Sequence, residues 1–244
     1  MDDLFTPNPT DNLLPYDGQL YDLGQLDLGP LDIGEMNDTY NDLYQTLLTT
    51  LPWHSDIVTL FGKTHITKRK MVWMGDKSLS YQYSGHSHSA IEWHPIVFHV
   101  KQIIEHSIHA LKLNPAEASH NSDLDNTVRR NSFNKENHSY FNACLLNYYP
   151  SGSEAMGYHA DNEKELGAQP LIAALSLGAT RKMLFKHKPV KYEELQDKVA
   201  LHLTSGKLIV MAGITQQYWK HSIPKTKKVA DGRISLTFRR ILTV

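Results

Sequence analysis

In its C-terminal third the chain reads Leu201-His-Leu-Thr-Ser-Gly-Lys-Leu-Ile-Val-Met211. Two short runs rich in Leu, Ile and Val flank a polar turn that contains glycine. Runs of this length that are bounded by turn residues are typical of β-strands rather than helices. The segment therefore predicts two strands, and Thr204-Ser205-Gly206 is interpreted as the turn of a hairpin between them.

Further short apolar runs extend this pattern in both directions. From residue 140 onward, turns of Gly, Pro or polar residues separate six predicted strands: Phe141–Tyr149, Leu171–Leu177, Lys182–Lys186, Leu201–Leu203, Lys207–Met211 and Arg233–Ile241. No long helix is predicted between them. Such a series predicts a sandwich or a barrel, so the fold class is mainly β, with the helices of an α+β protein in the N-terminal half.

The residues before 114 predict two helices. Apolar residues recur at 3- and 4-residue spacing over 40–51, with Asn37 and Asp38 as candidate caps and Pro52 at the end. A second helix is predicted over about 95–112, with a proline at its start. Between about 114 and 139 the composition turns to Asn, Ser, Asp and Glu, so we expect a mobile surface insertion there.

Residues 1–36 form an acidic arm ahead of a predicted domain at 37–244. The arm contains three copies of a five-residue repeat: Tyr21-Asp-Leu-Gly-Gln, Leu26-Asp-Leu-Gly-Pro and Leu31-Asp-Ile-Gly-Glu. Glycine at every fifth position argues against a helix, and three short copies are too few for a solenoid. The arm is predicted to be extended or disordered.

The formal net charge of −1 hides an uneven distribution. The first 62 residues hold 11 acidic residues and no Lys or Arg, so the remaining residues, with 25 basic and 15 acidic side chains, carry a net charge of +10. A basic body attracts polyanions, which makes nucleic acid a candidate partner.

Composition argues against several other classes of protein. No apolar run approaches the roughly 18 residues of a membrane span, and no basic segment followed by an apolar one marks a signal peptide. The single cysteine, Cys144, excludes an internal disulfide framework and a thiolate zinc cluster. We therefore expect a soluble intracellular protein without a membrane partner.

Two His-X-Asp triplets occur, His54-Ser-Asp56 and His159-Ala-Asp161. On an extended segment residues i and i+2 point to the same side, so a triplet can supply two of the two-His, one-carboxylate ligands that hold ferrous iron in non-haem oxygenases. The first triplet follows the end of a helix and nothing downstream completes a site, so we interpret it as a helix or turn cap. The second follows a strand and a glycine-rich turn, and His221 beside a later strand can complete the set.

The strand Arg233-Ile-Ser-Leu-Thr-Phe-Arg239 alternates apolar and polar residues, so both arginines emerge on one face. Their Cα atoms would be about 20 Å apart, and inward-leaning guanidinium groups would leave a gap that a short dicarboxylate fills. Asn147 and Tyr149 share one face of another strand and could complete a polar pocket. The alternative for both sets is a solvated strand end.

Four segments follow one another in a fixed order: Asn147-Tyr-Tyr149, His159-Ala-Asp161-Asn-Glu163, Lys220-His221-Ser and Arg233-Ile-Ser-Leu-Thr-Phe-Arg239. Earlier segments are Phe61-Gly-Lys63, Lys68-Arg-Lys70, Gly75-Asp76 and Tyr81-Gln-Tyr83-Ser-Gly85. Together they resemble the DNA-repair branch of the AlkB family of Fe(II)/2-oxoglutarate-dependent dioxygenases. The resemblance covers roughly residues 40–240. It implies a double-stranded β-helix, or jelly-roll, core with flanking helices and an N-terminal nucleotide-recognition lid over about 57–92.

The resemblance implies a role for each matching residue. His159, Asp161 and His221 would bind the Fe(II) ion and so form the catalytic centre. The residues implied to hold 2-oxoglutarate are Asn147, Tyr149, Arg233, Ser235, Thr237 and Arg239. Ser235 departs from the pattern, because the family usually has Asn at that position.

A basic and aromatic segment, residues 61–85, carries most of the implied nucleic-acid contacts. Cations suit phosphates and aromatic rings suit unpaired bases, whose stacking contributes about 1–3 kcal/mol each. Phe61 would act as a wedge in a duplex, and Tyr81 and Tyr83 would line the base pocket, with a buried strand core as the alternative for both tyrosines. The residues implied to contact the nucleic acid are Phe61, Lys63, Arg69, Tyr81, Tyr83, Ser84 and Glu163. Glu163 would contact the exocyclic nitrogen of the damaged base.

A second basic segment is the strand Arg181–Lys188. It resembles a further phosphate-binding edge of the family, and the alternative is a solvated strand with charged ends.

The implied activity is oxidative demethylation of N-alkylated bases, such as 1-methyladenine and 3-methylcytosine, in single- or double-stranded DNA, with RNA as a second substrate class. The reaction would use Fe(II), 2-oxoglutarate and O₂ and release formaldehyde, succinate and CO₂. Two alternatives stay open: a 2-oxoglutarate dioxygenase that acts on a protein or small molecule, and a non-catalytic binding module. We expect a monomer, cytoplasmic in a bacterium or nuclear in a eukaryote.

Overall fold

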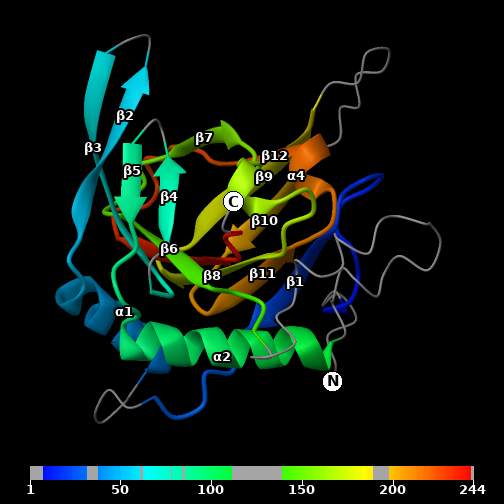
Figure 1. Cartoon of the computed structure of the whole chain (residues 1–244), viewed down its shortest axis with the longest axis horizontal. Helices are drawn as coiled ribbons and strands as arrows, with labels where there is room; N and C mark the ends of the chain where they lie inside the picture. The colour runs from blue at the N-terminus through cyan, green and yellow to red at the C-terminus, as the bar shows by residue number, and fades with distance from the viewer. Residues whose placement is uncertain are drawn as a thin grey trace.

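Strands dominate the protein (Figure 1). The computed structural model describes residues 8–31, 38–60, 63–77, 79–83, 86–111, 139–188 and 198–242, and within 56–65 and 80–89 it describes the backbone alone. The strands, in chain order, are β1 (Leu20–Gln25), β2 (His54–Leu60), β3 (Lys63–Gly75), β4 (Ser80–Tyr83), β5 (His86–Ser89), β6 (Ala143–Tyr149), β7 (Met156–His159), β8 (Ile172–Gly178), β9 (Arg181–His187), β10 (Lys198–Leu203), β11 (Lys207–Met211), β12 (Trp219–Ile223) and β13 (Arg233–Arg239).

Two antiparallel sheets form the jelly-roll core. The larger has seven strands in the order β1-β11-β8-β13-β6-β3-β2, and the smaller has four in the order β10-β9-β12-β7. β4 and β5 pair separately as a two-stranded sheet. The predicted mainly-β class and jelly-roll core are therefore confirmed, with β13 at the centre of the larger sheet between β8 and β6.

Two helices cover the outer face of the larger sheet. They are α1 (Thr39–Thr50), whose first turn is capped by the Asp38 carboxylate, and α2 (Pro95–Ala110), which runs along the lower side of the molecule in Figure 1. Both lie within two residues of their predicted bounds, because the apolar spacing, the aspartate cap and the proline at N1 are all local signals. Two short elements complete the fold: the single-turn helix α4 (Thr215–Tyr218), which buries Thr215 and Gln216, and the 3₁₀ turn η1 (Lys164–Leu166), which buries Leu166. Within the described ranges, no helix is long and apolar enough to cross a membrane.

The alternation of side chains along the central strand β13 separates the apolar core from a cavity on the other face of the sheet. On β13, Ile234, Leu236 and Phe238 pack in the core beneath the helices, while the four residues between and beside them line a cavity on the other side of the sheet. A second apolar core, which includes Phe185, Ile209 and Trp219, fills the space between the sheets. Successive side chains of a strand point to opposite faces, so one strand serves the core and the cavity at once.

The turn Thr204-Ser205-Gly206 does not join a hairpin, so that prediction is wrong. Lys207 N–H donates to the Thr204 carbonyl at 3.2 Å, and the chain does turn there. However, β10 pairs with β9 in the smaller sheet, whereas β11 pairs with β8 and β1 in the larger one. A turn sequence specifies a local change of direction, while the pairing partner depends on how the two sheets close around their shared core.

The acidic arm adds a strand to the larger sheet. β1 pairs antiparallel with β11 at the sheet edge, and Leu20, Leu26 and Leu28 are buried. Two copies of the repeat form the same turn, because Asp22 accepts from the Gly24 N–H at 3.0 Å and Asp27 accepts from the Gly29 N–H at 2.9 Å. Both glycines have positive φ, 71° and 56°, which glycine adopts without strain. The repeat thus alternates a polar turn with a buried leucine.

The segment predicted as a lid is continuous with the larger sheet. β3 pairs with β2 along most of its length and with β6 from Lys70 to Gly75. The interpretation of His54 as a cap is wrong, because His54 begins β2 with an exposed side chain. The helix that precedes it has Asp38 as its N-cap and Leu51 as its C-cap. The predicted surface insertion lies outside the described residues, apart from Ser139.

Candidate active site

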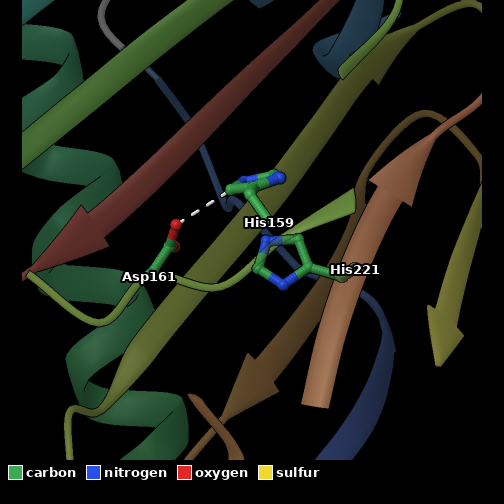
Figure 2. Close-up of side chains that lie close together, drawn as sticks. All are labelled: His159, Asp161 and His221. Carbon is green, nitrogen blue, oxygen red and sulfur yellow. Dashed lines mark ion pairs between the residues drawn. The ribbon is translucent and has the colours of Figure 1, made fainter. Parts of the chain in front are cut away.

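His159, Asp161 and His221 come together between the two sheets (Figure 2). His159 ends β7, and the register of the smaller sheet places it directly opposite His221 on β12. One ligand atom from each of the three side chains lies within 4.8 Å of the others, and no second cluster of this kind occurs in the described residues. The sheet register therefore unites a triplet and a histidine that are 60 residues apart in sequence.

The local electrostatics keep Asp161 and His221 in the forms that bind a metal ion. Burial lowers the pKa of His221 to about 4, so its imidazole is neutral at pH 7. Burial alone would raise the pKa of Asp161, but the Arg239 guanidinium and the two imidazoles lower it below its ordinary value, so the carboxylate is ionised. Neutral imidazole and ionised carboxylate are the ligand forms required by a divalent cation.

Hydrogen bonds from outside the cluster orient two of the ligands. His159 Nδ1 lies 2.9 Å from the Gly157 carbonyl, and a proton donated from Nδ1 leaves Nε2, which lies 3.6 Å from Asp161, as the ligand atom. The Asp161 N–H donates to the side-chain oxygen of Gln216 at 2.9 Å. Gln216 is 2% exposed and belongs to α4. This donor set fits a ferrous ion.

A cavity of about 70 Å³ adjoins the three ligands. Its polar lining residues are Asn147, Tyr149, His159, Asp161, Glu163, His221, Arg233, Ser235, Thr237 and Arg239. Asn147 and Tyr149 are 7% and 3% exposed, and Arg233 and Arg239 are 3% and 6% exposed. These residues are therefore buried in the interior and are not solvated strand ends.

The two arginines differ in their partners. Arg239 Nη2 lies 2.9 Å from the Asp161 carboxylate, so this guanidinium is joined to the ligand cluster. Arg233 Nη2 donates to the Ser176 hydroxyl at 2.8 Å, and its Nε has no hydrogen-bond partner in the part of the chain that the structure describes. Burial lowers the pKa of Arg233 only to about 10, so it is a cation at pH 7. A buried cation with an unused donor suits a carboxylate ligand.

The residues predicted to contact a nucleic acid are placed unequally. Glu163 lines the cavity, and its Oε2 is buried without a hydrogen-bond partner among the described residues. Arg69 is 5% exposed and its Nη1 donates to the Met156 sulfur at 3.1 Å, whereas its neighbours Lys68 and Lys70 are exposed. Lys63 lies on β3, and Tyr81 and Tyr83 on β4, where only the backbone is described. Phe61 and Ser84 lie outside the described residues.

Two residues that contact the site, Ser176 and Gln216, were not singled out from the sequence, and a third nearby residue, Arg181, was given another place. Ser176 interrupts the apolar strand β8, and a lone serine among leucines is a signal that could have found it. Gln216 belongs to a four-residue helix, and no local pattern marks it. Arg181 was interpreted as part of a basic edge, but it is 1% exposed and points inward, because β9 alternates buried and solvent-facing residues from its first position.

Comparisons with known proteins agree with this geometry. Residues 36–239 match the family model described as the 2OG-Fe(II) oxygenase superfamily. The human protein named "DNA oxidative demethylase ALKBH2" is 32% identical over 188 residues, which are 76% of this chain and 61% of that protein. The bovine "Alpha-ketoglutarate-dependent dioxygenase alkB homolog 3" is 29% identical over 206 residues, 82% of this chain and 61% of the relative. The chain thus spans about three fifths of the length of these curated relatives.

A solved structure supports the fold independently of close sequence similarity. "The structure of OsALKBH1" superimposes with a TM-score of 0.52 at 18% identity and covers 85% of this chain and 93% of the other. The family's reagents are Fe(II), 2-oxoglutarate and O₂, and the His-Asp-His cluster beside buried arginines fits the first two. The similar human and bovine proteins support the resemblance to the AlkB family. The chain belongs to the 2OG-Fe(II) oxygenase superfamily.

Proposed function

We propose that the protein removes methyl groups from N-alkylated bases of DNA by oxidation, with 1-methyladenine and 3-methylcytosine as substrates. The observation that carries this proposal is one cavity, lined mainly by buried residues, that joins a His-Asp-His cluster to Arg233 and Arg239. The names of the similar human and bovine proteins support the same chemistry.

His159, Asp161 and His221 would hold Fe(II), and the buried arginines with Asn147 and Tyr149 would hold 2-oxoglutarate. When bound, Fe(II) and 2-oxoglutarate activate O₂ so that the methyl carbon is hydroxylated and formaldehyde, succinate and CO₂ are released. Arg239 keeps Asp161 ionised, while the apolar walls around the cluster, which include Leu145, Met183 and Met211, exclude water from the reacting atoms.

Glu163 would recognise the base at the mouth of this cavity. Its Oε2 accepts no hydrogen bond within the described residues, and a buried acceptor without a donor is unfavourable. The exocyclic N–H of an adenine or cytosine would supply that donor. Glu163 thus favours bases with an exocyclic amine at the methylated edge.

A groove beside the cavity suits the strand that carries the target base. It has a volume of about 630 Å³ and is lined by residues 67–69 of β3, residues 153–157 and Lys225. Met156 lines both the groove and the catalytic cavity. Lys68 and Lys225 are exposed and would contact phosphates on either side of a base that enters the cavity.

The outer face of the smaller sheet supports a polyanionic partner. Lys198, Lys186 and Lys220 stand directly opposite one another across β10, β9 and β12, and all three are exposed. Like charges in directly opposed positions destabilise a sheet, and phosphates bound across the row would relieve this repulsion. The row provides sequence-independent contacts to a nucleic-acid backbone.

The test is formaldehyde release from oligonucleotides that carry 1-methyladenine or 3-methylcytosine in single-stranded DNA, duplex DNA and RNA, with and without 2-oxoglutarate. We expect release that depends on 2-oxoglutarate, is largest with DNA and is abolished in His159→Ala. If 2-oxoglutarate turnover is instead stimulated only by peptides or small molecules, the proposed substrate is wrong. Residual formaldehyde release by His159→Ala at the wild-type rate would overturn the assignment of the metal ligands.

A further inference from the structure

Arg181 lies at one end of the jelly roll, where it joins segments from both sheets. It begins β9 and is 1% exposed. Its guanidinium donates to three backbone carbonyls, those of Ser151 at 3.0 Å, Glu154 at 2.8 Å and Pro224 at 2.8 Å. The first two carbonyls belong to the connection between β6 and β7, and the third follows β12.

These connections flank the strands that carry the site. β6 carries Asn147 and Tyr149, β7 ends at His159, and β12 carries His221. One planar guanidinium therefore holds two connections in place. The first runs from Tyr149, a predicted 2-oxoglutarate residue, to the metal ligand His159, and the second follows the strand that carries the ligand His221. The bond to the Glu154 carbonyl is buried and the other two are partly buried. Carbonyls removed from water need such donors, so the loop geometry depends on this side chain.

Arg181 also contacts the pocket through an aromatic ring. Its guanidinium carbon lies 5.8 Å from the centroid of the Tyr149 ring, and that of Arg233 lies 5.5 Å from the same centroid. Both distances are within the range of cation–π attraction. The Tyr149 ring thus contacts two cations. Arg233 lines the cavity, whereas Arg181 does not.

We infer that Arg181 is a positioning residue for 2-oxoglutarate: through three loop carbonyls and the Tyr149 ring it holds Tyr149 and Arg233 where they bind the co-substrate. It does not touch the co-substrate. The inference rests on the placement of 2-oxoglutarate given under the proposed function.

The chemistry explains why an arginine is needed. Arginine presents five donors in a rigid plane and stacks on aromatic faces, whereas the lysine ammonium is a compact charge on a flexible stem. Lysine could satisfy some of the three carbonyls but not keep the planar contact with Tyr149. Arg181 and Arg233 also repel each other across the ring, so the positive charge at this end of the cavity favours a bound dianion.

The experiment measures equilibrium binding of 2-oxoglutarate to the Mn(II)-loaded full chain by calorimetry, a readout that needs no nucleic-acid substrate. Arg181→Met is expected to raise the Kd by about 10- to 100-fold, the range typical of removing a residue that orients ligating groups. Arg181→Lys should recover only part of the loss. The matched control is Lys182→Met, which removes the neighbouring exposed charge of the same strand and should leave the Kd within twofold.

Two further measurements separate positioning from general damage. Affinity for Mn(II) itself should change less than about threefold in Arg181→Met, and the KM for 2-oxoglutarate should rise with little change in kcat, because the metal ligands stay in place. If Arg181→Met does not fold, the comparison uses Arg181→Lys and a double-mutant cycle of that variant with Tyr149→Leu. The two changes should be non-additive if Arg181 acts through the ring.

The outcomes are distinguishable. If the wild-type chain binds 2-oxoglutarate and a folded Arg181→Met chain binds it equally well, the inference about Arg181 is wrong while the proposed function stands. If the effects of the two substitutions on 2-oxoglutarate binding are fully additive, Arg181 does not act through the Tyr149 ring. If the Mn(II)-loaded wild-type chain binds no 2-oxoglutarate, the placement of the co-substrate itself fails.

Discussion

Arg239 donates a hydrogen bond of 2.9 Å to the Asp161 carboxylate, and both side chains are buried. Arg239 is the last residue of β13, at the centre of the larger sheet, whereas Asp161 follows β7, at the edge of the smaller one. The pair therefore links the two sheets at the metal cluster. It also sets the charge of a ligand, because the guanidinium holds the pKa of Asp161 below its ordinary value in spite of burial.

Replacing Arg239 by methionine should weaken metal binding in a pH-dependent way. Without the guanidinium the pKa of Asp161 rises, so protons compete with the metal for the carboxylate at higher pH. On acidification, the Mn(II) affinity of the variant should therefore start to fall at a higher pH than that of the wild type. Breaking a buried ion pair from one side also destabilises the fold by about 3–5 kcal/mol. Calorimetric Mn(II) titrations between pH 5 and 8 test this, and an unchanged pH profile in a folded variant would contradict it.

The two His-X-Asp triplets provide an internal control for metal binding. His159→Ala should abolish measurable Mn(II) binding, because it removes one of three ligands. His54→Ala alters the other triplet, whose histidine is exposed on β2, and should leave the affinity unchanged. A comparable loss in both variants, measured by the same titration, would show that the cluster between the sheets is not the metal site.

The lysine row, Lys198, Lys186 and Lys220, should contribute to nucleic-acid affinity without contributing to stability. In the variant Lys186→Ala/Lys220→Ala, removal of opposed like charges should raise the melting temperature slightly, or leave it unchanged. Affinity for an oligonucleotide should fall, and the slope of log K against log salt should decrease by about 0.7–0.9 for each lysine lost. Lys207→Ala, which breaks a 2.7 Å ion pair with Asp22 on the larger sheet, is the control and should keep the wild-type slope. An unchanged slope in the double variant would show that the outer face of the smaller sheet does not contact the nucleic acid.

Glu154 should contribute stability only above its titration range. Burial would raise its pKa, but hydrogen bonds from the Ser153 hydroxyl and from the N–H and hydroxyl of Ser151 lower it below the ordinary value of 4.5. A group whose pKa is lower in the folded than in the unfolded chain stabilises the fold above the unfolded pKa and ceases to do so as the pH falls through the folded pKa. Glu154→Gln should therefore reduce the free energy of unfolding by roughly 1–3 kcal/mol at pH 7.

This difference between wild type and Glu154→Gln should shrink as the pH falls below about 4.5, the ordinary value of the glutamate pKa. Urea unfolding curves at pH 7 and at successively lower pH provide the measurement. A constant difference across this range would mean that the carboxylate charge is not what stabilises the Ser151–Glu154 turn.

Much of this molecule follows from local sequence patterns. The helix after Asp38 and the strands around Asn147 and Arg233 have the predicted bounds to within a few residues, because caps, prolines and apolar periodicity act over one or two turns of chain. The alternation on β13 also correctly separates its apolar face from its cavity face. By contrast, the turn at Ser205 was assigned to a hairpin although it joins strands of different sheets.

The amino-acid sequence alone predicts His159, Asp161 and His221 as metal ligands and two arginines as partners for carboxylates, through residue type, spacing along strands and the resemblance to a known family. It could not show that Arg239 bonds Asp161, that Gln216 holds the Asp161 backbone, or that Arg181 is buried beside Tyr149 rather than exposed on a basic edge. Each of these contacts joins residues far apart in the chain, and it exists only because two sheets close face to face and bring their strands into one register.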